Sequence, residues 1–234
     1  MIGQQNVLDA SPAGVPAVYP LPMRAGCVLN LDMQDRGARI LDHSGVGSHG
    51  LSYGSIPLAA LYGLAREFDG TDDYLNHGSN PKVAITGSAP RTILCWVNLS
   101  NYNNANTMLS YGMKAPGRML QLSTDQGLGK LAVRLYGNDH VSNTVVPLSS
   151  WRLVGVVIFD MTSILCLDGM PVSIMTDHDA IDTASSNVII GSKLDIAAGT
   201  YLAGEIGMVQ VYNYALSADD ILAAYRENAW RYGR

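Results

Sequence analysis

Short apolar runs separated by turn residues dominate residues 27–212. Within residues 130–136 apolar side chains alternate with polar ones, which places the leucines and valine on one face and Arg134 on the other. Residues 92–99 and 151–159 are apolar enough to form central strands. Short strands at this spacing predict two antiparallel sheets packed face to face.

Residues 163–175 carry the pattern of a β-hairpin. Two apolar runs flank the dipeptide Asp168–Gly169, which is a preferred two-residue hairpin turn. Pro171 follows the turn and cannot donate a ladder hydrogen bond, so we expect the second strand of this hairpin to lie at a sheet edge.

The end of the chain reads as a strand followed directly by a helix. Residues 206–211 carry strand-like apolar positions. Ser217 then stands where a helix N-cap is expected, and Asp220 three positions later completes a capping box. This pattern predicts a short helix over about residues 218–228.

The first residues of the chain have a different character. Residues 1–26 contain four prolines at positions 12, 16, 20 and 22 among apolar side chains. Proline fixes φ and removes a donor, so this segment is expected to be extended. It is too apolar for a solvated tail, which favours an arm packed on its own domain or on a neighbour over a disordered terminus.

Three segments match, in order, those of one known family. The first, residues 27–50, ends in the loop Asp-His-Ser-Gly-Val-Gly-Ser-His-Gly, and the second is Glu-Phe-Asp-Gly-Thr-Asp-Asp-Tyr-Leu at 67–75. The third is the closing strand and helix, residues 202–225, with Tyr-Asn-Tyr-Ala-Leu-Ser between them. These segments resemble the laminin-G-like (concanavalin A-like) jelly-roll family.

The resemblance covers roughly residues 27–226 and implies an all-β, two-sheet antiparallel jelly-roll sandwich with a short C-terminal α-helix. The organisation we predict is an extended arm over 1–26, one laminin-G-like domain over 27–226, and an aromatic and basic tail over 227–234. The resemblance to this family identifies a fold more firmly than a function, because one fold hosts many functions.

Composition narrows the function classes. The net charge of −5 offers no basic face for nucleic acid. Apolar runs stay short of the ~20 residues that cross a bilayer, so no membrane insertion is expected. The start of the chain lacks the pattern of a secretory signal. The three cysteines, Cys27, Cys95 and Cys166, lie in apolar runs, which favours buried thiols over one disulfide with a thiol left over.

Catalysis is not expected. Related sandwiches include glycoside hydrolases, in which paired carboxylates on one strand do the chemistry. The nearest stretch here begins at Glu205 and lacks two of the three acids of that motif.

Binding sites are a more open matter. The resemblance implies that calcium is a possible ligand, and the clearest candidates for it are Asp177, Asp179 and Asp182. Asp42 and the group Asp69, Asp72 and Asp73 are the other candidates. Turn capping is the simpler role for all three groups of acids.

Contact with a glycan or a protein partner is the second candidate type of site. The Asn-rich loop of residues 98–106 suits such a contact because end loops of a sandwich are free to carry recognition. The aromatic Trp230 suits it because tryptophan is enriched at interfaces. The residues selected are Asn101, Tyr102, Asn103, Asn104 and Trp230.

The sequence leaves three functional hypotheses. The first is a non-enzymatic virion structural protein of a bacteriophage, a capsid-decoration or a tail and adhesion component, assembled in the host cytoplasm. Its arm would hold the jelly roll to other virion proteins or to copies of itself. The alternative is a carbohydrate-binding module, calcium-assisted or not, at the cell surface or outside the cell, where a host-surface glycan is a candidate partner. The third is a hydrolase-like sandwich that has lost its catalytic acids.

Overall fold

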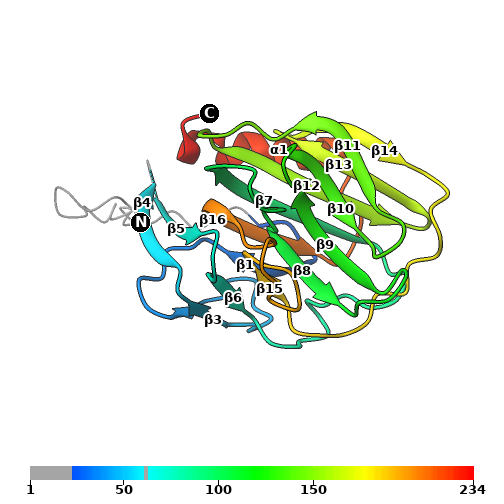
Figure 1. Ribbon diagram of the computed structural model, residues 1–234, viewed down its shortest axis with the longest axis horizontal. Coiled ribbons are helices and arrows are strands. Elements are labelled where there is room, and N and C mark those ends of the chain that lie inside the picture. The colour runs from blue at the N-terminus through cyan, green and yellow to red at the C-terminus, as the bar shows by residue number, and fades with distance from the viewer. Residues whose placement is uncertain (1–22, 61–62) are drawn as a thin grey trace, which may run out of the picture.

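The computed structural model describes residues 23–60 and 63–234. In these residues two antiparallel sheets pack face to face, and α1 (Ala218–Ala229) lies against the outer face of one of them (Figure 1). The all-β sandwich with a C-terminal helix is therefore confirmed. The predicted arm over 1–26 lies outside the described residues, apart from its last four.

Sheet A carries the helix. Its strands run in the order β14-β13-β12-β7-β16-β5-β4, and β1 pairs with β16 beside β5. Their bounds are β1 (Cys27–Leu31), β4 (Ile56–Ala60), β5 (Gly63–Asp69), β7 (Arg91–Leu99), β12 (Arg152–Phe159), β13 (Thr162–Leu167), β14 (Met170–Met175) and β16 (Ala203–Tyr212).

Sheet B faces sheet A across the core. Its strands run in the order β11-β10-β9-β8-β15-β6-β3-β2. Their bounds are β2 (Arg39–Ile40), β3 (Gly50–Tyr53), β6 (Tyr74–Asn76), β8 (Leu109–Gly112), β9 (Met119–Thr124), β10 (Lys130–Arg134), β11 (His140–Val145) and β15 (Ile189–Ile190).

The main core fills the space between the sheets. On β10, Leu131 and Val133 are fully buried in it, whereas Arg134 points to the other face, as the alternating pattern predicts. On β9, Leu120 and Leu122 point inward in the same way. The odd positions of β9 are therefore left for the outer face of sheet B.

The predicted hairpin is confirmed as β13 and β14. Asp168 and Gly169 both have positive φ, 51° and 83°, the conformation that a tight turn between right-twisted strands needs. Pro171 lies on β14, which is the edge strand of sheet A, so its missing N–H leaves no gap in a central ladder.

The predicted C-terminal helix is also confirmed. Ser217 accepts a hydrogen bond from the Asp220 N–H, and the Asp220 carboxylate accepts one from the Ser217 N–H. Leu216 and Ile221 are both buried in a second, smaller core between α1 and sheet A. No helix found among residues 23–60 and 63–234 has the length and hydropathy that a bilayer span requires.

Residues 227–234 are not a separate tail, which corrects the prediction from sequence. The helix continues to Ala229 and is followed by the 3-10 helix η1 (Trp230–Tyr232). Tyr232 is buried and stacks on Trp96 of β7, with ring centroids 4.5 Å apart. The end of the chain belongs to the second core because this ring fills the space above β7 and β16.

The last residues of the predicted arm are fixed on α1. Arg24 lies 3.4 Å from the Asp220 carboxylate and 3.1 Å from that of Glu227. These two bonds raise the pKa of Arg24, with the hydrogen bond to Glu227 contributing most. The chain therefore enters the described domain along the outer side of the helix.

All three cysteines are buried and unpaired, as the apolar runs around them predict. Burial raises the pKa of the Cys27 and Cys166 thiols to about 12. It raises the pKa of Cys95 further still, because that thiol is fully enclosed between the sheets.

Candidate functional site

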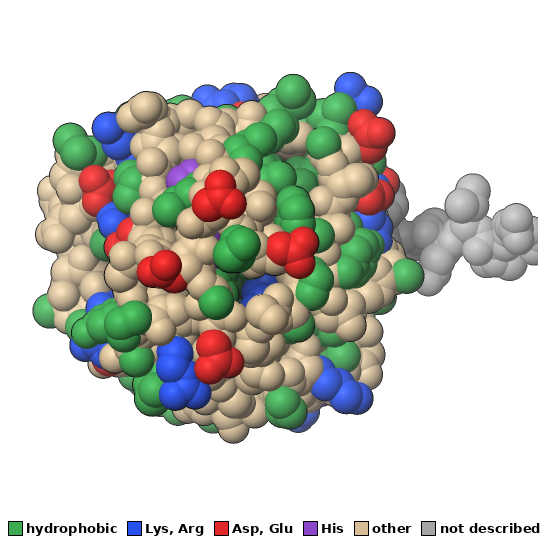
Figure 2. Space-filling model, turned by 90° about the vertical axis from the view of Figure 1, so that its right-hand side faces the viewer, with side chains coloured by type: hydrophobic (Ala, Val, Ile, Leu, Met, Phe, Trp, Pro, Cys, Tyr) green, Lys and Arg blue, Asp and Glu red, His purple; other side chains and the backbone are tan. Residues whose placement is uncertain are grey.

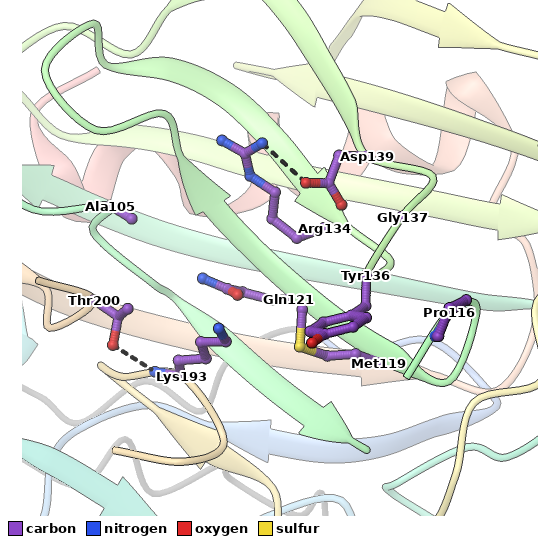
Figure 3. Close-up of a pocket in the computed structure, with 10 residues that line it drawn as sticks. All are labelled: Ala105, Pro116, Met119, Gln121, Arg134, Tyr136, Gly137, Asp139, Lys193 and Thr200. Carbon is purple, nitrogen blue, oxygen red and sulfur yellow. Dashed lines mark hydrogen bonds and ion pairs between the residues drawn. The ribbon is translucent and has the colours of Figure 1, made fainter. Parts of the chain in front are cut away.

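A pocket of about 420 Å³ opens on the outer face of sheet B. Strands β9 and β10 supply its floor, and four loops supply its walls (Figure 3). The residues that line it are Ala105, Pro116, Met119, Gln121, Arg134, Tyr136, Gly137, Asp139, Lys193 and Thr200. Its volume lies within the range of about 300–1,000 Å³ that is typical of small-molecule sites.

Gln121 and Arg134 form the floor. They are directly opposed on β9 and β10, and both side chains point out of the sheet. The Gln121 amide donates to the Thr107 hydroxyl at 2.8 Å, and Arg134 forms ion pairs with Asp125 at 2.5 Å and Asp139 at 3.1 Å. These bonds hold the floor in one arrangement before any ligand arrives.

Tyr136 forms one wall, on the loop between β10 and β11. Its backbone has a φ of 57°, and the side chain is 40% exposed beside the floor. Asp139 holds this loop, because its carboxylate accepts a hydrogen bond from the Leu135 N–H at 3.0 Å as well as from Arg134. The loop therefore places a partly exposed aromatic ring at the pocket.

The opposite wall comes from the loop between β15 and β16. Thr200 donates to the Ala197 carbonyl and accepts from the Lys193 N–H, which turns both side chains toward the cavity (Figure 3). Asp195 of the same loop forms a 2.5 Å ion pair with Lys114, which precedes β9. The hydrogen bond to Asp195 raises the pKa of Lys114, so the two loops are joined by a charged contact at neutral pH.

This combination of groups suits a polar ligand with an apolar face. A ring such as Tyr136 packs on the C–H face of a sugar, as aromatic side chains do on other apolar groups. Amide, guanidinium, ammonium and hydroxyl groups around it donate to and accept from hydroxyl groups. Asp139 is the one carboxylate among the lining residues, so the pocket has no pair of acids for glycoside hydrolysis.

The Asn-rich loop selected from sequence lies beside the pocket but is held by its own bonds. The Asn104 amide donates to the carbonyls of Gly70 and Tyr201, at 2.6 and 3.1 Å. Asn101 accepts from the Asn103 N–H, and the Tyr102 hydroxyl donates to the Val146 carbonyl at 2.5 Å. Their predicted contact with a ligand stays a prediction, and in this structure the loop reaches the pocket only through Ala105.

Trp230 lies far from the pocket in the fold, on η1 at the end of the chain. Its ring is 42% exposed, its indole N–H donates to the Glu227 carbonyl, and the Arg231 guanidinium lies 5.0 Å from the ring centre. The structure thus leaves it on the surface, as expected for a contact residue, but separate from Asn101–Asn104.

The structure does not bring Asp177, Asp179 and Asp182 together as a metal site. Asp177 has a φ of 59° in the turn after β14, and all three residues are exposed. Asp182 lies 3.7 Å from Arg118 instead. The three acids are close in sequence, but the turn directs their side chains apart.

Asp69, Asp72 and Asp73 are the one acidic group that the described residues bring together. Their ligand atoms lie within 4.8 Å of one another. The Asp69 carboxylate accepts from the N–H of Thr71 and of Asp72, and that of Asp73 accepts from the Asp69 N–H. These bonds are the turn capping that the sequence favours for this group.

Burial, followed by the nearby acids, raises the pKa of Asp73. The group thus has the carboxylate oxygens that calcium prefers, although calcium needs about six to eight oxygens in all.

Charge is distributed without a large field of one sign on the face shown in Figure 2, where acidic and basic side chains are scattered among others. A continuous basic surface is what nonspecific binding of nucleic acid requires. This face therefore offers no support for a nucleic-acid partner, and the absence of such a partner stays a prediction.

The pocket itself was not found from sequence. Alternation correctly places Arg134 on the outer face, but nothing in the chain shows that Gln121 lies opposite it. Tyr136 precedes a polar stretch over residues 137–144, which is the one local signal of a recognition loop. Lys193 and Thr200 are remote in sequence and are brought to the pocket only by the pairing of β15 with β8.

Comparison with known families and structures agrees with this architecture. A laminin-G-type family model, described as the concanavalin A-like lectin/glucanases superfamily, matches residues 69–222. No curated protein matches the chain by sequence.

Among solved structures, domain 4 of AbnA, a GH43 extracellular arabinanase from Geobacillus stearothermophilus, in complex with arabinotriose, has a TM-score of 0.68. It is 13% identical and covers 85% of this chain and 98% of that domain. At this identity the likeness shows the fold alone.

Two other similar structures belong to longer chains. Trypanosoma rangeli sialidase in complex with sialic acid has a TM-score of 0.69 and 18% identity, and covers 90% of this chain. The binding domain of Paraclostridial Mosquitocidal Protein 1 has a TM-score of 0.67 and 14% identity, and covers 88%. This chain spans 34% of the first and 52% of the second, so it corresponds to a part of each.

Proposed function

The chain belongs to the concanavalin A-like lectin/glucanases superfamily, and from that premise we propose that it is a carbohydrate-binding domain whose ligand occupies the pocket on the outer face of sheet B. The observation that carries the proposal is a partly exposed tyrosine ring, Tyr136, that lines the same pocket as the fixed polar groups of Gln121 and Arg134. Flat aromatic surfaces with a few placed hydrogen-bonding groups are what sugar rings need.

The similar structures add to this support. The arabinanase domain is described with arabinotriose and the sialidase with sialic acid. The alternative of the sequence analysis, a carbohydrate-binding module, is therefore favoured over a virion structural protein. No comparison bears on a virion location or on a phage origin.

The proposed domain binds its ligand without converting it. One carboxylate lines the pocket, and it is engaged by Arg134 and by the Leu135 N–H. Hydrolysis of a glycosidic bond uses two carboxyl groups, one of which must be free to move a proton. Incubation of the full chain with any glycan that it binds should therefore leave the glycan intact by mass spectrometry.

Calcium is not part of the proposed pocket. The acidic group Asp69, Asp72 and Asp73 lies outside the lining residues, so binding of a glycan is expected to be the same in calcium and in a chelator. A calcium-dependent rise in the melting temperature that the Asp69→Asn variant loses would assign the ion to this group.

The test is a pair of matched tyrosine variants. The full chain is screened on a glycan array that includes arabino-oligosaccharides and sialylated glycans, and hits are titrated by calorimetry. Tyr136→Ala should weaken binding by about tenfold or more, since an aromatic contact and its buried area are lost. Tyr53→Ala removes a tyrosine of similar exposure, 44% against 40%, from outside the pocket and should leave affinity unchanged. Equal affinities for the two variants would contradict the proposal.

A further inference from the structure

A second hollow, separate from the proposed glycan pocket, lies on the outer face of sheet A. It has a volume of about 210 Å³ and lies between the hairpin β13–β14 and the first turn of α1. Ile164 and Ile174 form its sheet side, and Leu216 and Ile221 form its helix side, with Pro171 at the edge. We call it the β14–α1 groove.

The groove is apolar and partly enclosed. No charged side chain is among the residues that line it. Ile174 is 62% exposed, the largest exposed fraction of any large hydrophobic side chain in the described part of the chain, and Met170 on the same edge strand is 55% exposed. Exposed apolar side chains around an apolar hollow indicate a surface that contacts another apolar group.

The chain carries an apolar segment immediately before the residues that contact α1. Residues 1–22 contain one charged residue, Asp9, and they lead into Arg24, which is fixed on α1 by Asp220 and Glu227. Ile221, the next residue after Asp220, faces the groove. The segment therefore joins the domain one helix width away from the hollow.

The sequence of the segment suits an extended ligand. Prolines at positions 12, 16, 20 and 22 favour the polyproline II conformation, in which every third residue shares a face. Val15, Val18 and Leu21 have this spacing and form one apolar stripe. A segment in the polyproline II conformation docks through its side chains, so it needs no backbone hydrogen bonds to the edge strand β14.

The length of the upstream segment and its effective concentration both favour an occupant of the groove from the same chain. A helix is about 10–12 Å across with its side chains, and an extended segment advances about 3.1 Å per residue. About four residues upstream of Met23 therefore cross α1, which brings Val15 and Val18 to the hollow. A tethered segment acts at an effective concentration of about millimolar, which a second copy in dilute solution does not reach.

We propose that residues 15–18 of the same chain occupy the β14–α1 groove, with Val15 and Val18 packed against Ile174 and Ile221. The contact buries the exposed edge of sheet A and fixes the beginning of the chain against the helix. It is independent of glycan binding, because the groove and the pocket lie on the outer faces of different sheets.

Photo-crosslinking in the full chain tests the proposal. A benzoylphenylalanine is introduced at position 174, and at position 128 as the control, because Leu128 is similarly exposed (56%) and lies outside the groove. After irradiation, peptide mass spectrometry should find crosslinks from position 174 to residues 15–18 in monomeric protein, and none from position 128. Crosslinks that join two copies, or none to residues 1–22, would overturn it.

A second measurement covers the chance that the photoreactive ring alters the groove. Elastase, which cleaves after small aliphatic residues, is applied to the full chain at native conditions, and cleavage after Ala17 or Val18 is followed. Ile174→Ser should speed this cleavage by about fivefold or more, because cleavage follows the fraction of open segment. Leu128→Ser should not. Equal rates in the parent chain and in both variants would overturn the proposal.

Discussion

Asp42 shows how one side chain organises a whole loop. Its carboxylate accepts hydrogen bonds from the N–H groups of Asn30, Ser44 and Ser48, at 3.0, 2.9 and 2.9 Å, and from the Ser44 hydroxyl at 2.8 Å. Burial by itself would raise the pKa of Asp42, but these donors outweigh it and lower the pKa below the usual value. The ionised form is thus the one that holds the loop.

The variant Asp42→Asn should lower the free energy of unfolding by about 1–3 kcal/mol at pH 7, because an amide cannot accept all of these bonds. A lowered pKa gives stability that is present above the unfolded-state value of about 3.9 and lost as pH falls through the folded-state value. Urea unfolding should therefore show the gap between parent and variant shrinking from pH 7 to pH 3.

The exposed Asp179→Asn is the control and should match the parent at both pH values. A gap for Asp42→Asn that stays the same at pH 3 would mean that the charge of this carboxylate is not what stabilises the loop.

At the scale of elements, a glycine on β16 leaves room for the end of the chain to pack against the sheet. A Cβ atom added at Gly207 would lie 2.4 Å from Cε1 of Tyr232, the ring that stacks on Trp96. Glycine at this position therefore leaves the space that η1 fills.

Gly207→Ala should destabilise the protein by about 1–3 kcal/mol through overpacking, and it should weaken the near-UV circular dichroism of the Trp96–Tyr232 stack. Gly63→Ala is the matched control, because a Cβ atom at that strand glycine meets nothing within 4 Å. A loss of stability that is the same for both variants would point to strand propensity rather than to Tyr232.

The cap of α1 gives a second prediction for an element. Ser217→Ala removes the acceptor for the Asp220 N–H and half of the capping box, so we expect a loss of about 1 kcal/mol in the free energy of unfolding. Urea titration measures this directly. An unchanged midpoint would show that the packing of Leu216 and Ile221 alone positions the helix.

Local signals explain which elements the sequence predicts well. The turn Asp168–Gly169, the cap Ser217 and the alternation on β10 each lie within a few residues of the structure that they specify. Residues 227–234 read as a tail because the space for Tyr232 is made by Gly207, some distance back along the chain. The pocket was missed for the same reason, since Gln121, Arg134 and Lys193 meet only once the strands have paired.

The same contrast applies to the predicted metal ligands. Asp177, Asp179 and Asp182 are neighbours in sequence, but neighbouring residues of a turn point in different directions. Asp69, Asp72 and Asp73 do converge, because one turn after β5 wraps back on itself through the bonds that Asp69 and Asp73 accept. The sequence correctly predicts turn capping for this group, but it does not show that the three carboxylates lie close together.

At the scale of the whole molecule, His140 connects the two sheets at one edge. It lies on β11 of sheet B, and its ring nitrogens are 2.8 Å from the Ser163 hydroxyl and 2.7 Å from the Ser173 hydroxyl, on β13 and β14 of sheet A. Burial, and then the nearby His178, lower the pKa of His140. The neutral ring is therefore the form that the folded protein holds.

A lowered histidine pKa gives stability that is complete above the unfolded-state value of about 6.5 and is lost as pH falls below it toward the folded-state value. Thermal unfolding should show that His140→Gln is less stable than the parent at pH 8, and that the difference narrows by pH 5. A parallel pair of curves for His140→Gln would contradict this assignment.

The three enclosed thiols have a practical consequence. With pKa values of about 12 for Cys27 and Cys166 and one higher still for Cys95, the native cysteines present almost no thiolate to a reagent at neutral pH. A single cysteine placed on the surface would then be the fast-reacting one in the folded chain. Dyes, spin labels or a solid support can thus be attached at one chosen point, without first removing the natural cysteines.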